Sequence, residues 1–539
     1  MFKIDEILDN LTLEDLYGQV LCIEISDKDD PKEVEETVKK IKPGGIYVSG
    51  MLPDKIKSYT EMINRYVKIP IIVAADIEFG PGSAIKGETL LPHPMAWGAC
   101  DDSDLIERAG YLTGKIARAS GISWTFSPVM DINYNFNNPI TNIRAVSDSP
   151  KQVVKIAGAY AKGLQKANVV ACCKHFPGDG VDDRNQHFCT TVNSLSKTEW
   201  DKTYGYVYKE ISKMGIGSVM AAHIALPCYE KQKPDMFGYL PSVLSKSLLT
   251  ELLRNQLGYN GCIVSDAMSM IGACSRVDLD QLAVSFLNAG GDMVLFPEKN
   301  DFDNIKHAVE RGVLKKDVLL RAVKNIISMK SKAKLFESEQ ENVTLNKDRA
   351  ELKKIAQLIA DKSIKTERDV NHLLPQKIKK GGKVLLINLY AMSANKNNKK
   401  EKNVLSGIRK DLNKRGYETT VLNNPGHYYI NSIMNEYDLV LVNARFLPAE
   451  FTSGSSLRIN WDSIMTFWRG YLLKHKNVIF CSFGDPYKLY EFPYLKTYVN
   501  AFSDSEFSQK AFLKAVLGEI ELTAKNPVGL KGFFEREVE

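Results

Sequence analysis

The chain lacks any apolar run that approaches the roughly 18 residues needed by a membrane-spanning helix. Its first residues, Met1 to Glu6, carry early acidic side chains and no apolar core of the length typical of a signal peptide. These two absences argue against membrane insertion. They predict a soluble chain that works in the cytoplasm, if no leader has been removed.

An excess of charge of one sign is missing as well. The 71 Lys and Arg residues nearly balance the 65 Asp and Glu residues, and the formal net charge is only +6 in 539 residues. We find no Lys/Arg stripe with interleaved aromatic residues, which is typical of nucleic-acid binding. The lysine-rich run from Lys396 to Lys402 indicates a solvated loop. Nucleic acid is therefore not expected as a partner. The sequence does not distinguish a monomer from a homodimer.

Cysteine is sparse and irregularly placed. The nine cysteines are odd in number and include no Cys-x-x-Cys pair. Several lie inside apolar segments, which predicts reduced, buried thiols in a reducing compartment. Cys173 directly precedes Lys174, but a buried core thiol is favoured there over a catalytic one.

What the sequence does have is an alternation of short apolar segments with helical patterns, which is typical of helices packed around a parallel sheet. Eight such segments are expected to be strands, and eight is the number that a TIM-type (β/α)8 barrel requires. They are Gln19 to Ile25, Gly45 to Ser49, Ile71 to Asp76, Thr125 to Met130, Val169 to Lys174, Ser218 to His223, Cys262 to Asp266 and Met293 to Phe296.

Helical patterns lie between these segments, and a chain of 539 residues is long enough for two or three units. We predict a barrel domain over 1–335, a helical connector over 336–380 and a smaller α/β sandwich domain over 381–539. The helices are expected at 104–119, 151–166, 197–213 and 246–256, and Ser196-x-x-Glu199 forms a capping box before the third. Strands of the second domain are expected at 383–389, 439–443 and 478–481.

Two of the predicted barrel strands end in side chains that handle protons. One runs into Lys174-His175-Phe176-Pro177-Gly178-Asp179-Gly180, with His187 seven residues further on, and the other runs into Asp266. Barrel enzymes keep their chemistry at the carboxyl ends of their strands. An acid or base on one loop and a carboxylate on another strand end are the two groups that acetal cleavage needs.

These residues make the chain resemble glycoside hydrolase family 3, in the β-N-acetylglucosaminidase branch that carries a carboxyl-terminal α/β domain. The resemblance rests on the order and spacing of landmarks along roughly the first 300 residues. The landmarks are Asp76-Ile77-Glu78-Phe79-Gly80, Phe126 to Asp131, Asn138-Pro139 with Arg144, Lys174 to Gly180, and Leu257 to Gly261 leading into Val264-Ser265-Asp266.

The resemblance implies retaining hydrolysis of terminal β-linked N-acetylglucosamine, without a metal or an organic cofactor. Asp266 matches the family's nucleophile, a role that we favour over a helix N-cap. His187 matches the acid/base of this branch, and an imidazole that titrates near neutrality suits that role. Asn185 occupies the position where the family has an aspartate that partners this histidine. Cell-wall fragments and chitin oligosaccharides are the expected substrates.

Sugar-binding roles are taken from the resemblance only at positions that match the family's motifs. Asp76 is expected to accept hydrogen bonds from sugar hydroxyls, while Arg144, Lys174 and His175 donate to the sugar or brace it. An Asx turn at Asp76 and a surface salt bridge at Arg144 are the alternatives. His223 fits a site-lining residue and a packed strand-end residue equally well.

Three positions depart from the family pattern. Phe79-Gly80-Pro81-Gly82 replaces a glycine pair and an arginine, which leaves Lys86 as the candidate for the missing cation. Asp179 stands where histidine is frequent, and Asn185 replaces the partner aspartate. Three other functions stay open. A β-glucosidase or β-xylosidase of the family would place a glutamate acid/base on the second domain, and the Lys174 to His187 loop argues against it. A phosphorylase is an alternative because a neutral histidine-based site repels phosphate less than a glutamate-based one, and Asn185 and the missing arginine motivate a catalytically impaired sugar-binding protein.

Overall fold

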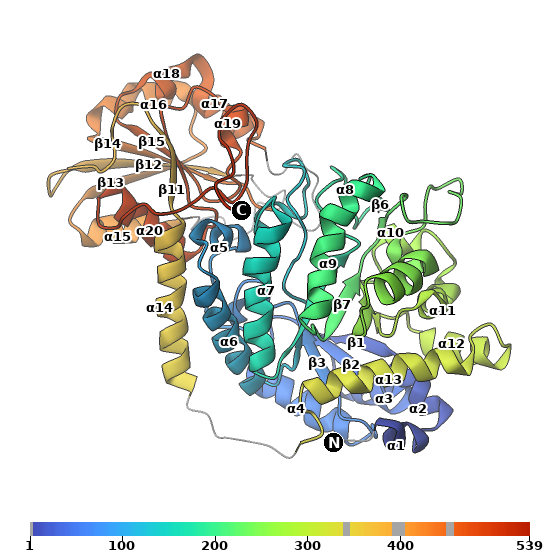
Figure 1. Cartoon of the computed structure of the whole chain (residues 1–539). Helices are drawn as coiled ribbons and strands as arrows, with labels where there is room; N and C mark the ends of the chain where they lie inside the picture. Colours follow the sequence, from blue (N-terminus) through green and yellow to red (C-terminus); the bar gives the residue numbers. More distant parts are fainter. Residues whose placement is uncertain (1–3, 338–344, 391–404, 449–457) are drawn as a thin grey trace. The chain divides into compact units, whose positions relative to one another are not determined.

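The computed structural model describes residues 4–337, 345–390, 405–448 and 458–539 (Figure 1). They form two compact units: the first comprises residues 1–90, 103–134 and 153–353, and the second comprises 91–102, 135–152 and 354–539. The predicted domain limits near residues 335 and 381 stay a prediction, and the second unit also includes two segments from early in the chain. The lysine-rich run 396–402 lies outside the described residues. Within them, no helix is long and apolar enough to cross a membrane.

The first unit is a TIM-type barrel, as predicted. Its eight parallel strands follow the order β10-β1-β2-β3-β4-β5-β7-β9, and a bridge between Val264 and Met293 joins the two ends of the sheet. All eight predicted strands are present. They are β1 (Leu21–Ile25), β2 (Gly45–Val48), β3 (Ile72–Ala75), β4 (Trp124–Thr125), β5 (Val170–Phe176), β7 (Ser218–Ala221), β9 (Cys262–Ser265) and β10 (Val294–Leu295).

The fourth strand is much shorter than the predicted segment 125–130. β4 ends at Thr125 because Pro128 has no N–H to donate to a strand ladder. The chain beyond it nevertheless runs beside β5. Cys172 donates its backbone N–H to the Ser127 carbonyl at 3.0 Å, and Met130 donates to the Lys174 carbonyl at 2.7 Å.

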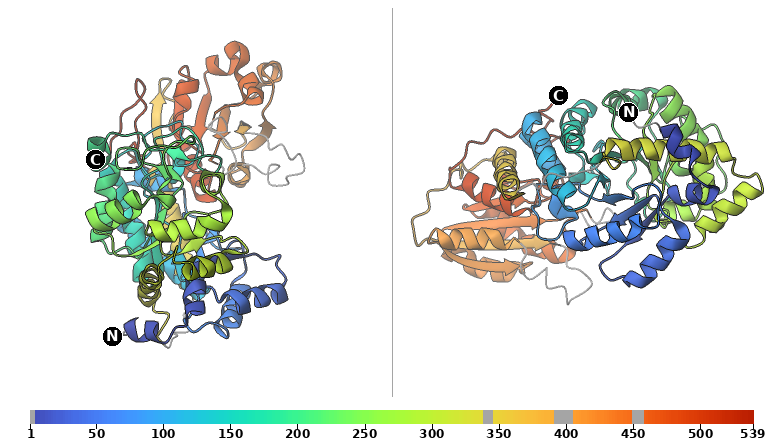
Figure 2. Two further views of the ribbon diagram at one scale, coloured as in Figure 1. Left: turned by 90° about the vertical axis from the view of Figure 1, so that its right-hand side faces the viewer. Right: turned by 90° about the horizontal axis from the view of Figure 1, so that it is seen from below.

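The helices of the first unit lie outside its strands (Figures 1 and 2). The predicted helices 104–119 and 151–166 are confirmed, the predicted helix 197–213 breaks at Thr203 into two, and 246–256 winds as a π-helix at Ser247–Gln256. The capping box is present: Ser196 Oγ accepts from Glu199 N at 3.3 Å, and Glu199 Oε2 accepts from Ser196 N at 3.0 Å. The α-helices around these strands are α1 (Ile4–Asp9), α2 (Leu13–Gln19), α3 (Pro31–Ile41), α4 (Pro53–Asn64), α6 (Ser103–Ala119), α7 (Pro150–Lys166), α8 (Lys197–Lys202), α9 (Tyr204–Lys213), α10 (Ile271–Cys274), α11 (Leu279–Ala289), α12 (Asp301–Glu310) and α13 (Lys316–Lys332).

Helix α3 shows how the sequence sets one of these elements. Asp30 caps it by accepting from Lys32 N at 2.9 Å, and Pro31 occupies the first turn, where its missing N–H costs nothing. Val34, Val38 and Ile41 repeat at helical spacing and are buried, and Val34 and Val38 belong to one cluster with residues of β2 and β3.

The second unit is built on a six-stranded sheet in the order β11-β16-β15-β14-β12-β13, with β11 antiparallel at its edge. The three predicted strands are confirmed, and three more are present. β11 falls within the segment predicted as the connector. The strands are β11 (Lys365–Asp369), β12 (Lys383–Tyr390), β13 (Glu418–Asn423), β14 (Leu439–Arg445), β15 (Val478–Ser482) and β16 (Thr497–Asn500).

Helices cover both faces of this sheet (Figure 1). Each face carries its own apolar cluster, since alternate side chains of β12 and β14 point to opposite sides. One cluster includes residues of α16 (His427–Ile433), α17 (Trp461–Phe467), α18 (Tyr471–Lys474) and α19 (Lys488–Glu491). The other includes residues of α14 (Leu345–Ser363), α15 (Ser406–Lys414) and α20 (Glu506–Val516). Helix α5 (Pro94–Cys100) also belongs to this unit.

Candidate active site

The carboxyl ends of four barrel strands carry the predicted site residues of the first unit. Asp76 follows β3, Lys174 and His175 are among the last three residues of β5, and Asp266 directly follows β9. His223 lies two residues beyond the end of β7, which neighbours both β5 and β9 in the sheet. Parallel strands of a closed barrel end on the same side, so these side chains share the barrel mouth.

Asp266 is held by backbone hydrogen bonds on both sides. Its N–H donates to the Ala221 carbonyl at 2.7 Å, and its Oδ1 accepts from the Ala267 N–H at 2.8 Å. Burial by itself would raise the pKa of this carboxyl, but electrostatic interactions with His223, His175 and Lys174 and the Ala267 hydrogen bond outweigh it. The pKa of Asp266 is therefore held below its ordinary value, and the partly exposed side chain is an ionised carboxylate at neutral pH.

A second cluster at the mouth pairs one cation with two carboxylates. Lys174 Nζ lies 2.8 Å from Asp76 Oδ1 and 2.8 Å from Glu78 Oε1. Tyr47 OH donates to Asp76 Oδ2 at 2.9 Å. Burial and the charge of Asp76 raise the pKa of Tyr47, which keeps its hydroxyl a donor. The Lys174 side chain is only 6% exposed, whereas that of Asp76 is 42% exposed. The Asp76 carboxylate is therefore accessible to solvent, and buried Lys174 holds it in position.

His175 is oriented by a buried aspartate. Asp131 Oδ2 lies 2.6 Å from His175 Nδ1, and Asp131 Oδ1 accepts from His175 N at 3.1 Å and from Asp179 N at 2.8 Å. A carboxylate facing Nδ1 puts the hydrogen on that nitrogen and leaves Nε2 as the opposite atom of the ring. Asp131 therefore fixes both the ring and the start of the loop that follows.

His187 lies on this loop and is partly exposed. The Oδ1 atom of buried Asn185 accepts from His187 N at 2.9 Å and lies 2.7 Å from His187 Nδ1. Because the amide oxygen is an acceptor, Nδ1 carries the hydrogen and Nε2 is the ring atom that can exchange a proton with a substrate. The pairing of Asn185 with His187 that the resemblance implies is therefore present in the structure.

Gln186 ties the loop to the strand end that carries Asp266. Its Oε1 accepts from His223 N at 3.2 Å, and its Nε2 donates to Asp179 Oδ2 at 3.3 Å. His223 in turn donates from Nε2 to the Ala267 carbonyl at 2.9 Å. The ring of His223 is fully buried, and burial lowers its pKa although the charge of Asp266 acts in the opposite direction. His223 is thus a packed strand-end residue that links the loop to the position after Asp266.

The two other acidic residues of the loop differ from each other. Asp182 accepts from Arg184 and from Val192 N at 2.8 Å; burial would raise its pKa, but the Arg184 hydrogen bond leads the opposing effects that lower it. Its carboxylate therefore braces the loop backbone. Asp183 is exposed.

Arg144, Lys86 and Cys173 complete the residues that the sequence singled out. Arg144 belongs to the second unit, in the short 3-10 helix Asn142–Arg144, where its Nη1 donates to the Ile140 carbonyl at 3.2 Å. Its part in sugar binding stays a prediction. Lys86, the candidate for the missing cation, is exposed. Cys173 is buried, and burial raises the pKa of its thiol well above the ordinary value, which agrees with a core role.

Four residues that contact the candidate site residues were not predicted as site residues. Glu78 and Asp131 lie inside landmark segments, which was the available signal, but nothing in the sequence assigned them to Lys174 and His175. Tyr47 and Gln186 gave no signal, since their partners are distant in sequence or are backbone groups.

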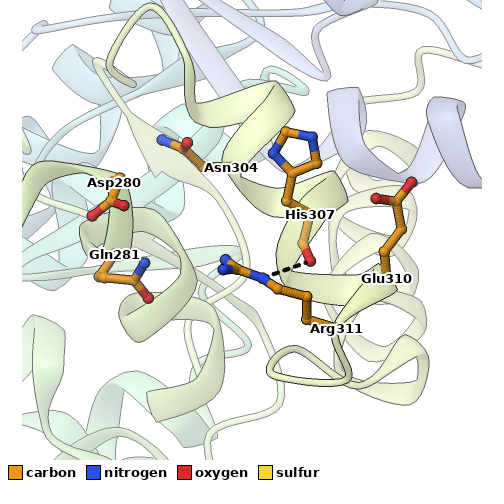
Figure 3. A pocket seen from close by; sticks show the side chains of 6 residues that line it. All are labelled: Asp280, Gln281, Asn304, His307, Glu310 and Arg311. Carbon is orange, nitrogen blue, oxygen red and sulfur yellow. Dashed lines mark hydrogen bonds between the residues drawn. The ribbon is translucent and has the colours of Figure 1, made fainter.

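A separate pocket of about 390 Å³ opens between α11 and α12 (Figure 3). Its walls are polar and come from helix surfaces, not from strand ends. The lining residues are Asp280, Gln281, Asn304, His307, Glu310 and Arg311. None of the predicted site residues contributes to it.

An ionised carboxylate and an oriented imidazole at the mouth of a barrel define a site for acetal cleavage, the chemistry of a glycosidase. The family model described as the glycosyl hydrolase family 3 N terminal domain matches residues 12–329. The chain therefore belongs to glycosyl hydrolase family 3, and it is a glycoside hydrolase.

One relative agrees with this assignment along nearly the whole chain, and another agrees over about half of it. A β-N-acetylglucosaminidase/β-glucosidase of Cellulomonas fimi is 28% identical over 531 residues, covering 96% of this chain and 93% of that protein. A β-hexosaminidase of Bordetella avium is 32% identical over 255 residues, covering 46% of this chain and 70% of that protein.

Solved structures share the fold of both units. The β-glucoside phosphorylase BglX bound to 2FGlc superposes with a TM-score of 0.87 and 29% identity, covering 98% of this chain and 96% of that chain. A family 3 β-N-acetylglucosaminidase from Paenibacillus sp. str. FPU-7 has a TM-score of 0.83 and 22% identity, with coverage of 96% and 99%.

Proposed function

We propose that the enzyme removes terminal non-reducing β-linked N-acetylglucosamine with retention of configuration. Asp266 is the nucleophile and His187 is the acid/base. The observation that carries the proposal is the link through Gln186 and His223, which ties the loop of His187 to the residue after Asp266 by hydrogen bonds of 2.9 to 3.2 Å.

In the first step Asp266 attacks the anomeric carbon, and the bond from that carbon to the leaving oxygen breaks. The proton on His187 Nε2 moves to this oxygen, so the leaving group departs as an alcohol. The lowered pKa of Asp266 supports this role, because the carboxylate is present without a base to ionise it.

In the second step water attacks the anomeric carbon of the glycosyl ester. His187 Nε2 takes a proton from this water, the ester bond breaks, and Asp266 leaves as a carboxylate. The sugar is released with its original configuration after two displacements. Asn185 holds the imidazole through Nδ1 during both steps.

The cluster around Lys174 supports recognition of the sugar that is transferred. Asp76 accepts from hydroxyls of this sugar, and Lys174 and His175 donate to it or brace its binding groups. Arg144 remains the proposed fourth contact. The preference for an N-acetylamino sugar is supported by the relative from Cellulomonas, whose name includes β-N-acetylglucosaminidase beside β-glucosidase.

Imported cell-wall fragments or chitin oligosaccharides in the cytoplasm are the proposed natural substrates. The nine free cysteines support a reducing compartment.

The proposal is tested by comparing chromogenic β-N-acetylglucosaminide and β-glucoside substrates with the same leaving group. We expect the higher kcat/KM for the N-acetylglucosaminide. A slow fluorinated glycoside should label Asp266, as identified by peptide mass spectrometry. A label on another carboxylate would contradict the nucleophile assignment, and no turnover of either substrate would favour a sugar-binding protein.

Phosphorolysis is a second candidate, favoured by the neutral partner of the acid/base. A carboxylate beside His187 would repel an entering phosphate, whereas the Asn185 amide does not. Phosphate oxygen would attack the anomeric carbon of the glycosyl ester, displace Asp266 and give a sugar 1-phosphate. The similarity to the β-glucoside phosphorylase BglX supports this candidate.

The two candidates separate in one experiment. Turnover is followed with and without inorganic phosphate, and the products are identified by ³¹P NMR. Sugar 1-phosphate that forms at a rate proportional to phosphate concentration identifies a phosphorylase. Free sugar formed at a rate independent of phosphate identifies a hydrolase.

A further inference from the structure

A tight turn after β8 (Ile224–Ala225) displays two large apolar side chains to solvent. Met236 is 88% exposed and Phe237 is 63% exposed. The turn is closed at its base, because Asp235 N donates to the Gly238 carbonyl at 3.2 Å and Gly238 N donates to the Asp235 carbonyl at 3.1 Å. Asp235 Oδ1 also accepts from Phe237 N at 2.7 Å. These apolar groups are therefore held in place in solvent.

Arg276 holds this turn in position through hydrogen bonds. Its Nη2 lies 2.9 Å and 3.0 Å from the two carboxylate oxygens of Asp235, and its Nη1 donates to the Phe237 carbonyl at 2.7 Å. The guanidinium also lies 5.8 Å from the centroid of the Phe237 ring. The Arg276 side chain is only 3% exposed, and both of its Nη atoms donate hydrogen bonds to this turn, so a buried cation holds the turn in position.

The segment that carries Arg276 is attached to the acid/base loop. Ile271, the first residue of α10, donates its N–H to the His187 carbonyl at 3.1 Å, and Thr190 Oγ1 donates to the Gly272 carbonyl at 2.8 Å. A Cβ on Gly272 would lie only 2.5 Å from the Gln186 carbonyl oxygen, so the helix packs here against bare backbone.

Strand pairing gives a second connection between the turn and the loop. β6 (Thr191–Val192), which closes the loop of His187, pairs with β8, which leads to the turn. Phe188 and Ile271 are exposed apolar side chains at the junction between the loop and α10.

We propose that Phe237 and Met236, together with Phe188 and Ile271, form a binding surface for the leaving group of the substrate. The expected occupant is a pyranose ring that stacks its C–H face on Phe237. This inference rests on the proposed role of His187: an acid that protonates the glycosidic oxygen lies beside the leaving group, which then extends over the loop of His187 and the elements attached to it. Apolar and aromatic side chains are the groups that cover a sugar ring's C–H face.

The test uses the double variant Met236→Ala/Phe237→Ala and two donors that carry the same transferred sugar. One donor is a β-linked disaccharide, and the other is the glycosyl fluoride, whose leaving group has no ring to bind. We expect kcat/KM for the disaccharide to fall about tenfold, as the loss of one aromatic contact and its burial implies, while the fluoride changes less than about twofold. Val313→Ala is the matched control, because Val313 is 52% exposed on the same unit between α12 and α13.

Equal losses on the two donors, or an unchanged disaccharide rate, would overturn the leaving-group surface while leaving the proposed function intact. Light scattering on the wild type and the double variant adds a second criterion. A wild-type dimer that becomes monomeric in the double variant would assign the turn to contacts between copies of the chain and overturn the inference. A wild-type enzyme that turns over neither donor contradicts the proposed function itself, and the inference falls with it.

Discussion

The strand ends of the barrel and those of the second sheet carry different kinds of polar groups. At the barrel mouth Asp76, Lys174 and Asp266 are ionisable and partnered by opposite charges. In the second sheet neighbouring strands carry amides in register instead: Asn443 Nδ2 donates to Asn388 Oδ1 at 3.1 Å, and Asn388 Nδ2 donates to Asn423 Oδ1 at 3.3 Å.

The difference shows which polar groups hold a sheet together and which are available for chemistry. An amide both donates and accepts, so one amide can hydrogen-bond to another without any charge. The amide row formed by Asn443, Asn388 and Asn423 therefore stabilises the sheet and supplies no acid, base or nucleophile. A carboxylate such as Asp266 keeps its charge through partners such as Lys174 and the Ala267 N–H, and it is then available for the proposed role of nucleophile. Substitutions at the two places should therefore separate activity from stability.

The largest effect on activity is expected from Asp266→Ala. Turnover of an activated aryl glycoside should fall by at least about 1,000-fold, because the covalent path is lost. The circular dichroism spectrum and Tm should change little, since the side chain is partly exposed at a strand end. Activity within about tenfold of the wild type would remove Asp266 from the mechanism.

His187→Ala should give a smaller effect that depends on the leaving group. A disaccharide with a poor leaving group should lose about 100-fold or more in kcat/KM, whereas an activated aryl glycoside needs little protonation and should lose far less. The ratio of the two losses is the measurement. Equal losses would assign His187 to positioning of the loop. Azide should restore turnover where release of the glycosyl ester limits the rate.

Asn185→Asp should change the pH profile in a defined direction. A carboxylate beside Nδ1 stabilises the imidazolium and raises the pKa of His187, so the acid form persists to higher pH and the basic limb of kcat/KM moves upward. We expect faster turnover of natural disaccharides as well. Asp183→Asn is the matched control, because it changes one charge on the same loop at an exposed position. A limb that moves with Asp183 and not with residue 185 would make Asp183 the partner.

The smallest effect on activity is expected from the amide row. Asn443→Ala removes the donor to Asn388 in a buried position and should lower the free energy of unfolding by about 1 to 3 kcal/mol. The kcat measured well below Tm should stay unchanged. Asn423→Ala, at an exposed position of the same row, should change stability by less than about 0.5 kcal/mol. A large loss of kcat in Asn443→Ala would link the second sheet to the chemistry.

The sequence predicted most of the barrel because its strands are continuous apolar runs that are buried on both faces. It was weaker in the second unit. β11 reads Lys-Thr-Glu-Arg-Asp and β13 begins Glu-Thr-Thr, and such half-buried edge strands have no continuous apolar signal. The predicted helix 197–213 also ignored the break at Thr203, which local periodicity does not reveal.

In the site, groups close in sequence were predictable and groups joined by the fold were not. Asn185 and His187 are two residues apart, and the resemblance paired them. His175 and Asp131 are 44 residues apart, and Lys174 and Asp76 are 98 apart; the resemblance named Lys174, His175 and Asp76 as sugar-binding residues but predicted neither pair. The contacts of Gln186 and His223 involve backbone groups, which leave no trace in residue identity.

The connection from Gln186 through His223 to Ala267 also bears on how the enzyme responds to salt. It consists of an amide, a backbone N–H, an imidazole that burial keeps neutral and a carbonyl, so it contains no net charge at neutral pH. Salt weakens interactions between ions and leaves such dipolar links almost untouched. We therefore expect this link between the loop of His187 and the residue after Asp266 to persist from dilute buffer to concentrated salt.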